Sequence, residues 1–236
     1  MTNRARSFLI AGGLVVLLVV IGIVASQSGS DDDGGGGSGV DDTAELEALF
    51  DGIPQSGLVV GDPDAPVRVV EFGDLQCPFC AQFAETVPDV IERYVRTGQI
   101  SLEFAPLHFI GPDSEALARL VGAASLQDRA WPLLEVLYAR QGPENSGYAT
   151  EDFLREAAEA VPGLDVEQAL ADADSQEVTD ILSDAQARAE EFGVDSTPSF
   201  FWAPSGRDRF QRLDVPSLDI GGFADAIEPV LSRASG

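Results

Sequence analysis

Lysine is absent from this sequence of 236 residues, and all 14 basic residues are arginine, against 40 Asp and Glu. The formal net charge of −26 argues against binding to nucleic acids or anionic lipid headgroups, which carry the same sign of charge. Cysteine and histidine are also scarce, with two Cys and one His. Two cysteines cannot form a framework of several disulfides, and with one histidine they fall short of the four ligands that structural zinc takes.

An uninterrupted apolar run covers residues 8–25, near the start of the chain. As a helix it would be about 27 Å long, just enough to cross the hydrocarbon core of a membrane. Arg4 and Arg6 precede the run and three aspartates follow it, so the positive-inside rule predicts a cytoplasmic N-terminus. The sequence therefore predicts a single-pass anchor with an extracytoplasmic remainder, or a secreted protein if the segment is a signal peptide cleaved near residues 24–26.

Beyond this segment, composition and periodicity predict a linker and one mixed α/β domain. Residues 26–56 are expected to form a flexible acidic, Gly-rich linker followed by a short helix capped by Asp42. Strands are expected at 67–72 and 100–106, joined by a helix that Pro88 interrupts. A crossover of this kind is right-handed and makes the two strands parallel.

The stretch from 114 to 192 has almost no strand pattern. Five helical patterns follow one another there, separated by Pro, Gly or Asn-Ser-Gly, at 114–126, 130–141, 151–160, 166–173 and 176–192. Strands at 199–203 and 209–213 and a helix at 221–231 are expected to complete the domain.

The cysteine pair, Cys77 and Cys80, lies where the first strand pattern changes to a helical one. Two thiols three positions apart in the first turn of a helix can close a disulfide, and the helix dipole favours the thiolate of the first. We therefore expect Cys77 to be the exposed nucleophile and Cys80 the more buried resolving thiol. The alternatives are a metal site and a static disulfide, although so small a loop constrains the unfolded chain very little.

Two further features accompany the cysteines. Pro198 precedes a strand pattern, where a proline cannot donate a ladder hydrogen bond unless the chain adapts, for example by a cis Thr197–Pro198 peptide. Glu71 stands six residues before Cys77. An acidic residue at this distance, a Cys-Pro-x-Cys motif and a late Gly-Val-x-x-Thr-Pro motif together resemble the thioredoxin superfamily.

Within that superfamily, the 118 residues from Cys80 to Pro198 resemble the helical insertion of DsbA-like thiol:disulfide oxidoreductases. The similarity extends from about residue 58 to residue 231. It implies a thioredoxin-like α/β fold in two parts, 57–112 and 193–236, around an all-helical insertion at 113–192.

The resemblance also implies a role for each matching residue. Cys77 corresponds to the attacking cysteine and Cys80 to its partner, Pro198 to a cis-proline beside them, and Thr197 to the residue whose backbone pairs with a substrate peptide. Glu71 corresponds to the acidic residue beneath the active site. The family implies no cofactor other than the Cys77–Cys80 disulfide, exported protein thiols as substrates, and a membrane quinone-linked reoxidant that is DsbB-like or vitamin K epoxide reductase-like.

The residues themselves support a proton role for Glu71. It follows Val67 and Val69 on one face of a strand that is expected to be buried on both sides. Burial would raise the pKa of its carboxyl group and allow it to exchange a proton with Cys80, the alternative being a strand-end carboxylate that reaches solvent.

The direction of electron flow depends on the residues between the cysteines, Pro78 and Phe79. Strongly oxidising DsbA proteins carry His there, and a Phe79 side chain offers the Cys77 thiolate neither charge nor a hydrogen bond. Potentials in this superfamily span about 150 mV. The compartment favours oxidation of exported proteins, with a reductase or isomerase and a non-catalytic binding module as alternatives. His108, expected at the same end of the sheet, is either structural or tunes Cys77.

Overall fold

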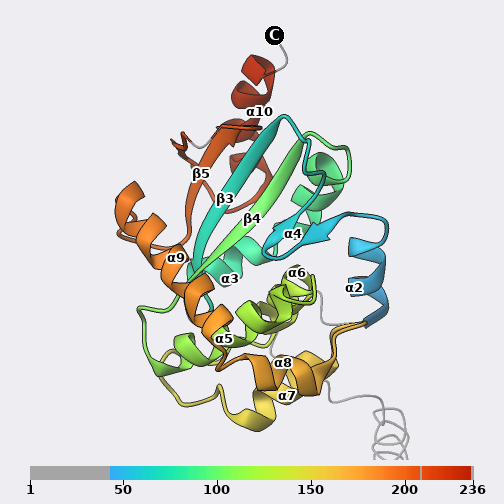
Figure 1. Ribbon diagram of the computed structural model, residues 1–236. Coiled ribbons are helices and arrows are strands. Elements are labelled where there is room, and N and C mark those ends of the chain that lie inside the picture. Colours follow the sequence, from blue (N-terminus) through green and yellow to red (C-terminus); the bar gives the residue numbers. More distant parts are fainter. Residues whose placement is uncertain (1–42, 208, 235–236) are drawn as a thin grey trace, which may run out of the picture. The chain divides into compact units, whose positions relative to one another are not determined.

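A computed structural model describes residues 43–207 and 209–234 as a six-stranded mixed sheet flanked by helices (Figure 1). The expected membrane segment, most of the linker and Asp42 lie outside these residues. The strands follow the order β1-β2-β4-β3-β5-β6 across the sheet. They are β1 (Gln55–Ser56), β2 (Val59–Val60), β3 (Val67–Asp74), β4 (Ile100–Leu107), β5 (Ser199–Pro204) and β6 (Gln211–Leu213).

The central strand, β3, positions the site. It runs parallel to β4, as the sequence predicted, and antiparallel to β5. Glu71 on β3 lies opposite Phe104 of β4 and Phe200 of β5. Seven of the eight β3 residues are buried, because helices cover both faces of the sheet at this strand.

The helices of the described residues come from four parts of the chain, separated by strands. They are α2 (Thr43–Phe50), α3 (Pro78–Ala84), α4 (Val87–Val90), the π-helix η1 (Ile91–Val95), α5 (Pro112–Ser125), α6 (Ala130–Ala139), α7 (Glu151–Glu159), α8 (Val166–Asp172), α9 (Gln176–Phe192) and α10 (Ile220–Ala234). Among them, none is long and apolar enough to cross a bilayer.

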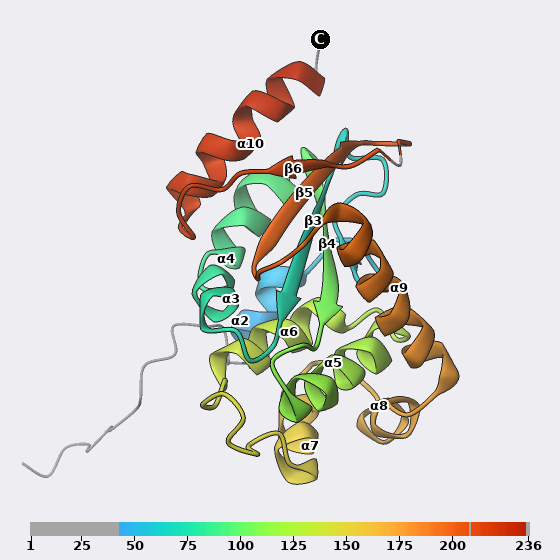
Figure 2. The same ribbon diagram turned by 90° about the vertical axis from the view of Figure 1, so that its left-hand side faces the viewer.

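The two faces of the sheet have separate apolar clusters. Val67 and Val69 of β3 belong to the larger cluster, which includes residues of α3, α4, α6 and α10. Val70 and Phe72 point the other way and pack with residues of α9. Figure 2 shows α3 and α4 on one side of β3 and α9 on the other, with α5 to α8 gathered beyond one end of the strands. The odd-numbered face of β3 is therefore the one that α3 and α6 enclose.

Most predicted elements are present. The helix after the cysteines breaks between Ala84 and Val87, and Pro88 then occupies the first turn of α4, where its missing N–H costs little. The five helices between Pro112 and Phe192 match the five predicted patterns. The division of the chain into two thioredoxin-like parts and an insertion stays a prediction.

One element was not predicted. Residues 55–60 form the β1–β2 hairpin, and β2 pairs antiparallel with the edge of β4. Strands of two residues are too short to show the alternation by which strands are recognised, and pairing with β4 is what orders them.

Phe83 tests the packing of the larger cluster. It is fully buried, and its ring lies 4.6 Å from that of Phe200 and 5.9 Å from that of Phe223, between centroids. Phe83→Ala should lower the free energy of unfolding in urea by about 3–5 kcal/mol. The matched change at the exposed Phe109 should alter it by less than ~0.5 kcal/mol. Equal losses in the two variants would contradict this packing.

Candidate active site

The two cysteines lie where β3 passes into α3. Cys77 is the residue immediately before α3, its N–H donates to the carbonyl of Asp74 at 3.0 Å, and Pro78 occupies the first helical turn. The tight turn places Cys77 at the helix N-terminus, where backbone N–H groups face its sulfur. Cys80 follows one turn later, on the side of α3 that packs against the sheet.

Both cysteines are free thiols and both are buried, although not equally. Cys80 has no exposed surface, as expected for the more buried partner. Cys77 is only 5% exposed, so the expectation of an exposed nucleophile was wrong. The segment before β5 accounts for part of this burial, because the Sγ of Cys77 donates to the carbonyl of Thr197 at 3.3 Å. The Thr197–Pro198 peptide is cis, as the resemblance implied.

The surroundings separate the acidities of the two thiols. The pKa of Cys77 falls from 9.0 to about 6, chiefly through a hydrogen bond from the Cys80 thiol, against an opposing effect of burial. The Thr197 side chain and the backbone N–H groups of Cys80 and Phe79 lower it further. Burial raises the pKa of Cys80 well above its ordinary value, and its bond with Cys77 and the charge of Glu71 act in the same direction. At neutral pH the pair therefore holds one thiolate, on Cys77.

Glu71 lies beneath this pair and is buried, as the strand pattern predicted. Desolvation, together with the charge of the nearby Cys77 thiolate, raises the pKa of its carboxyl group from 4.5 to about 8. A carboxyl group with this pKa is protonated at neutral pH and can give up its proton when a stronger base forms beside it. Its part in catalysis stays a prediction.

Asp74 is a buried polar residue that the sequence analysis did not identify. Its carboxylate accepts hydrogen bonds from the N–H of Gln76 (2.9 Å), the hydroxyl of Ser114 (2.6 Å) and the N–H of Ile110 (3.2 Å). These bonds tie the turn before Cys77 to the loop after β4 and to the start of α5. A carboxylate that ends a buried strand three residues before Cys77 is the signal that was available in the sequence.

A second set of contacts holds the turn from the side of α6. The side-chain amide of Gln141 donates to the carbonyls of Leu75 (2.8 Å) and Cys77 (3.2 Å), and the N–H of Asn145 donates to Gln76 (2.6 Å). The backbone that presents Cys77 is thus fixed by residues more than 60 positions later in the chain.

The side chains of Phe79 and His108 lie outside the buried group formed by Cys77, Cys80 and Glu71. The Phe79 side chain is 61% exposed, and Phe79 influences Cys77 only through its backbone N–H. His108 lines a groove of about 460 Å³ together with residues of α5 and α9, and it is not among the groups that shift the pKa of Cys77. The structure therefore gives no support to tuning of the Cys77 pKa by the side chain of Phe79 or by His108.

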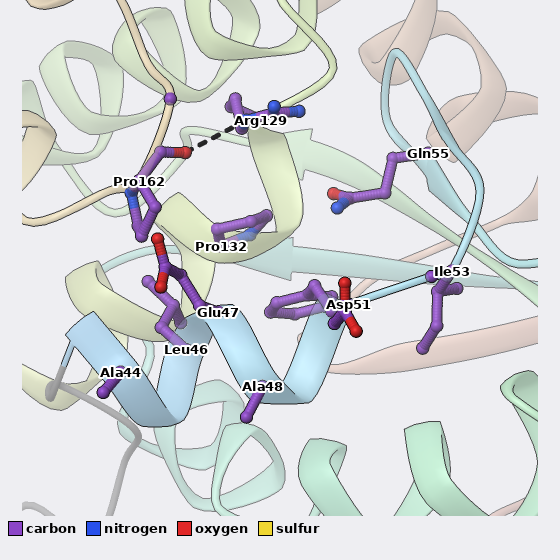
Figure 3. Close-up of a pocket in the computed structure, with 13 residues that line it drawn as sticks. Ala44, Leu46, Glu47, Ala48, Asp51, Ile53, Gln55, Arg129, Pro132 and Pro162 are labelled. Carbon is purple, nitrogen blue, oxygen red and sulfur yellow. Dashed lines mark hydrogen bonds between the residues drawn. The ribbon is translucent and has the colours of Figure 1, made fainter.

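A larger hollow lies away from the cysteines. It measures about 700 Å³ and is lined by α2, Arg129 and Pro132 near the start of α6, and Pro162 (Figure 3). Arg129 donates there to the carbonyl of Pro162 at 3.1 Å. None of the predicted site residues lines it. Within residues 43–207 and 209–234, no group of three or more Cys, His, Asp or Glu side chains is arranged to hold a metal ion.

Comparison with known proteins agrees with this arrangement. The family model described as thioredoxin matches residues 54–204. A probable disulfide bond formation protein D from Bacillus cereus is 36% identical over 146 residues, which are 60% of this chain and 68% of that protein. A thioredoxin-like oxidoreductase from Silicibacter pomeroyi superposes with a TM-score of 0.59 and 27% identity, over 79% of this chain and 97% of the other.

Oxidised BdbD from Bacillus subtilis shares the fold, with a TM-score of 0.62 and 21% identity over 78% of this chain and 98% of the other. The chain belongs to the thioredoxin superfamily. Within it, the chain is a DsbA-like thiol:disulfide oxidoreductase.

The thiolate of Cys77 provides a direct test of the site. In the reduced protein, the ultraviolet absorbance of the thiolate should rise with a midpoint at pH about 6. Thr197→Val removes one hydrogen bond to the sulfur and should move the midpoint upward, whereas Cys77→Ser should abolish the step. A midpoint near the ordinary value of 9.0 in the wild-type protein would contradict the geometry described above.

The raised pKa of Glu71 predicts a pH dependence of stability. Between pH about 4.5 and about 8 the carboxyl group is ionised in the unfolded chain but protonated in the folded one. The unfolded state therefore binds fewer protons, and this residue's contribution to stability falls as pH rises through that window, by on the order of a few kcal/mol. Urea unfolding of the reduced protein should show a smaller fall between these pH values for Glu71→Gln. Identical pH profiles for the two proteins would disprove the shift.

Proposed function

We propose that this protein is an extracytoplasmic oxidase that introduces disulfides into exported proteins by exchange through Cys77 and Cys80. The observation that carries the proposal is the unequal acidity of the two thiols, because it defines an attacking sulfur and a leaving sulfur. The 36% sequence identity to a probable disulfide bond formation protein D supports the oxidising direction.

The proposed reaction begins from the Cys77–Cys80 disulfide. A substrate thiolate attacks Sγ of Cys77, the disulfide breaks, and Cys80 leaves as a thiolate while a mixed disulfide forms on Cys77. Glu71 then protonates Cys80, whose pKa lies well above that of the carboxyl group. A second substrate thiolate attacks the substrate sulfur of the mixed disulfide and releases Cys77. The substrate loses two electrons to the enzyme, which is left with a Cys77 thiolate and a Cys80 thiol.

The low pKa of Cys77 favours this direction because it stabilises the reduced enzyme. Near pH 7 only the interval between the pH and the lowered pKa counts, which is about one unit or about 1.4 kcal/mol. For a two-electron couple this corresponds to ~30 mV, about a fifth of the span between thioredoxin and DsbA. Pro78 and Phe79 are proposed as the tuning dipeptide, with Phe79 acting through its N–H.

Thr197 and Pro198 are proposed to bind the substrate backbone. In the free thiol form, the Thr197 carbonyl accepts the S–H of Cys77. Neither the Cys77–Cys80 disulfide nor a mixed disulfide on Cys77 carries this S–H, so in both states the carbonyl can accept an N–H from an extended substrate peptide. The exposed Phe79, two residues from the reacting sulfur, offers an apolar contact to an unfolded chain.

The remaining parts of the proposal concern the cellular setting. The apolar run at 8–25 supports a single-pass anchor with the redox domain outside the cytoplasm, or secretion if it is cleaved. The reduced enzyme needs an electron acceptor, and a membrane quinone enzyme of the DsbB-like or vitamin K epoxide reductase-like kind would supply one. We also propose that residues 113–192 are a helical insertion between the thioredoxin-like parts 57–112 and 193–236.

The proposal is tested by mixing the oxidised protein with a reduced, unfolded ribonuclease and following recovery of native disulfides. Wild type should oxidise it, whereas Cys77→Ser and Cys80→Ser, which cannot form the internal disulfide, should both be inactive. If Cys77 of Cys80→Ser is first converted to its mixed disulfide with glutathione, a substrate thiolate should displace the glutathione and form a mixed disulfide with Cys77. Activity retained in Cys77→Ser would indicate a binding module. The reduction potential, measured against glutathione, should lie closer to about −120 mV than to about −270 mV. A potential near the lower value would overturn the oxidising direction in favour of a reductase.

A further inference from the structure

Glu135 is a buried carboxyl group that the proposed reaction does not use. It is the only charged residue of α6, whose other residues are apolar or aromatic, and it is 1% exposed. Its Oε2 atom is buried and finds no hydrogen-bond partner among the residues that the structure describes. Burying a polar atom without a hydrogen-bond partner costs free energy, so we expect a group that could bond to this oxygen.

A small enclosed cavity supplies the place for that group. Glu135 and Glu71 both line it, together with Trp131, Tyr138 and Phe104. The volume open to the centre of a water molecule is about 10 Å³, close to what a single water needs. A buried water also needs at least two polar partners, and the two carboxyl groups and the Tyr138 hydroxyl provide them. That hydroxyl donates to the Asp74 carbonyl at 3.4 Å, which leaves its oxygen free to accept.

The two carboxyl groups are electrostatically coupled. Burial, together with the charge of Glu71, raises the pKa of Glu135 from 4.5 to about 8. Two carboxylates that share an apolar site cannot both ionise readily. When Glu71 loses its proton, Glu135 therefore keeps its own, and a protonated carboxyl group is a hydrogen-bond donor.

We propose that Glu135 is a positioning residue for disulfide exchange: it remains protonated and donates a hydrogen bond, through one water molecule in this cavity, to the Glu71 carboxylate formed when Glu71 protonates Cys80. This inference rests on the proposed function. One proton moves from Glu71 to the Cys80 thiolate, and no electrons move in this step. The negative charge passes from the Cys80 sulfur to the Glu71 carboxylate, which already accepts the water-mediated hydrogen bond from Glu135.

The consequence is that Glu135 makes Glu71 a better acid than burial alone would allow. A lone carboxylate in an apolar cavity has no solvation, so without the donor the pKa of Glu71 should rise. Glutamine at position 135 keeps an N–H donor of similar size, whereas methionine keeps the volume and removes the donor.

The test compares Glu135→Gln and Glu135→Met with the wild type in the reduced protein. Infrared spectra follow the carboxyl C=O stretching band of Glu71 as a function of pH. The band is assigned by its loss in Glu71→Gln. The midpoint should rise by about one pH unit or more in Glu135→Met, and Glu135→Gln should stay within a few tenths of the wild type. Glu177→Gln, at an exposed site on α9, is the control with the same substitution.

The rate at which Cys80 is protonated after attack on Cys77 should show the same shift in its pH profile in Glu135→Met. A lower midpoint in that variant would mean that Glu135 is charged and repels Glu71, and no change in either variant would mean that the two groups do not interact; both overturn the proposal. If Glu135→Met does not fold, a rise of one unit in Glu135→Gln is sufficient to overturn it. Because the band is read without any substrate, the infrared shift can be present in a protein that fails the ribonuclease assay, which separates this inference from the proposed function.

Discussion

Unequal desolvation at the junction of β3 and α3 is the constraint on which the site depends. Cys77 accepts a hydrogen bond from the Cys80 thiol, with further help from Thr197 and backbone N–H groups, and takes the negative charge, whereas burial pushes Cys80 and Glu71 toward their neutral forms. The same burial that makes Cys80 a poor thiolate keeps Glu71 protonated at neutral pH, so that it has a proton to give to Cys80. Exposing this layer to water would bring the three pKa values toward their ordinary order and remove the distinction between attacking and leaving sulfur.

Helices from the middle of the chain maintain that desolvation. Residues of α6 close the apolar space above Glu71, and polar side chains after α6 and at the start of α5 hold the turn that carries Cys77. The helical region therefore does more than enlarge the domain. Its residues cover Glu71, fix the backbone that carries Cys77 and, through Glu135, add a second carboxyl group to the same cavity.

Much of the fold was predictable because it follows from local pattern. The parallel β3–β4 pair, the interruption at Pro88 and the five middle helices are all visible as periodicity and turn residues. The β1–β2 hairpin was missed, since two-residue strands exist only by pairing with β4. For the site, the cysteine spacing and the burial of Glu71 could be anticipated, whereas Asp74 and Glu135 required the fold. Glu135 did leave a trace, as one charged residue in the otherwise apolar Ala130–Ala139.

By itself, the sequence determined the chemistry: two thiols three positions apart, with no others to compete and a carboxyl group on the adjacent strand face. Spacing along the chain is enough for this, because a strand and a helical turn have known periods. Only the tertiary structure decided how deep each group lies. Burial depends on segments as distant as Cys77 and Thr197, or Glu71 and Glu135, and it set Cys77 nearly out of solvent where the sequence had indicated exposure. Acidity follows burial, so the division of roles between the two sulfurs belongs to the fold.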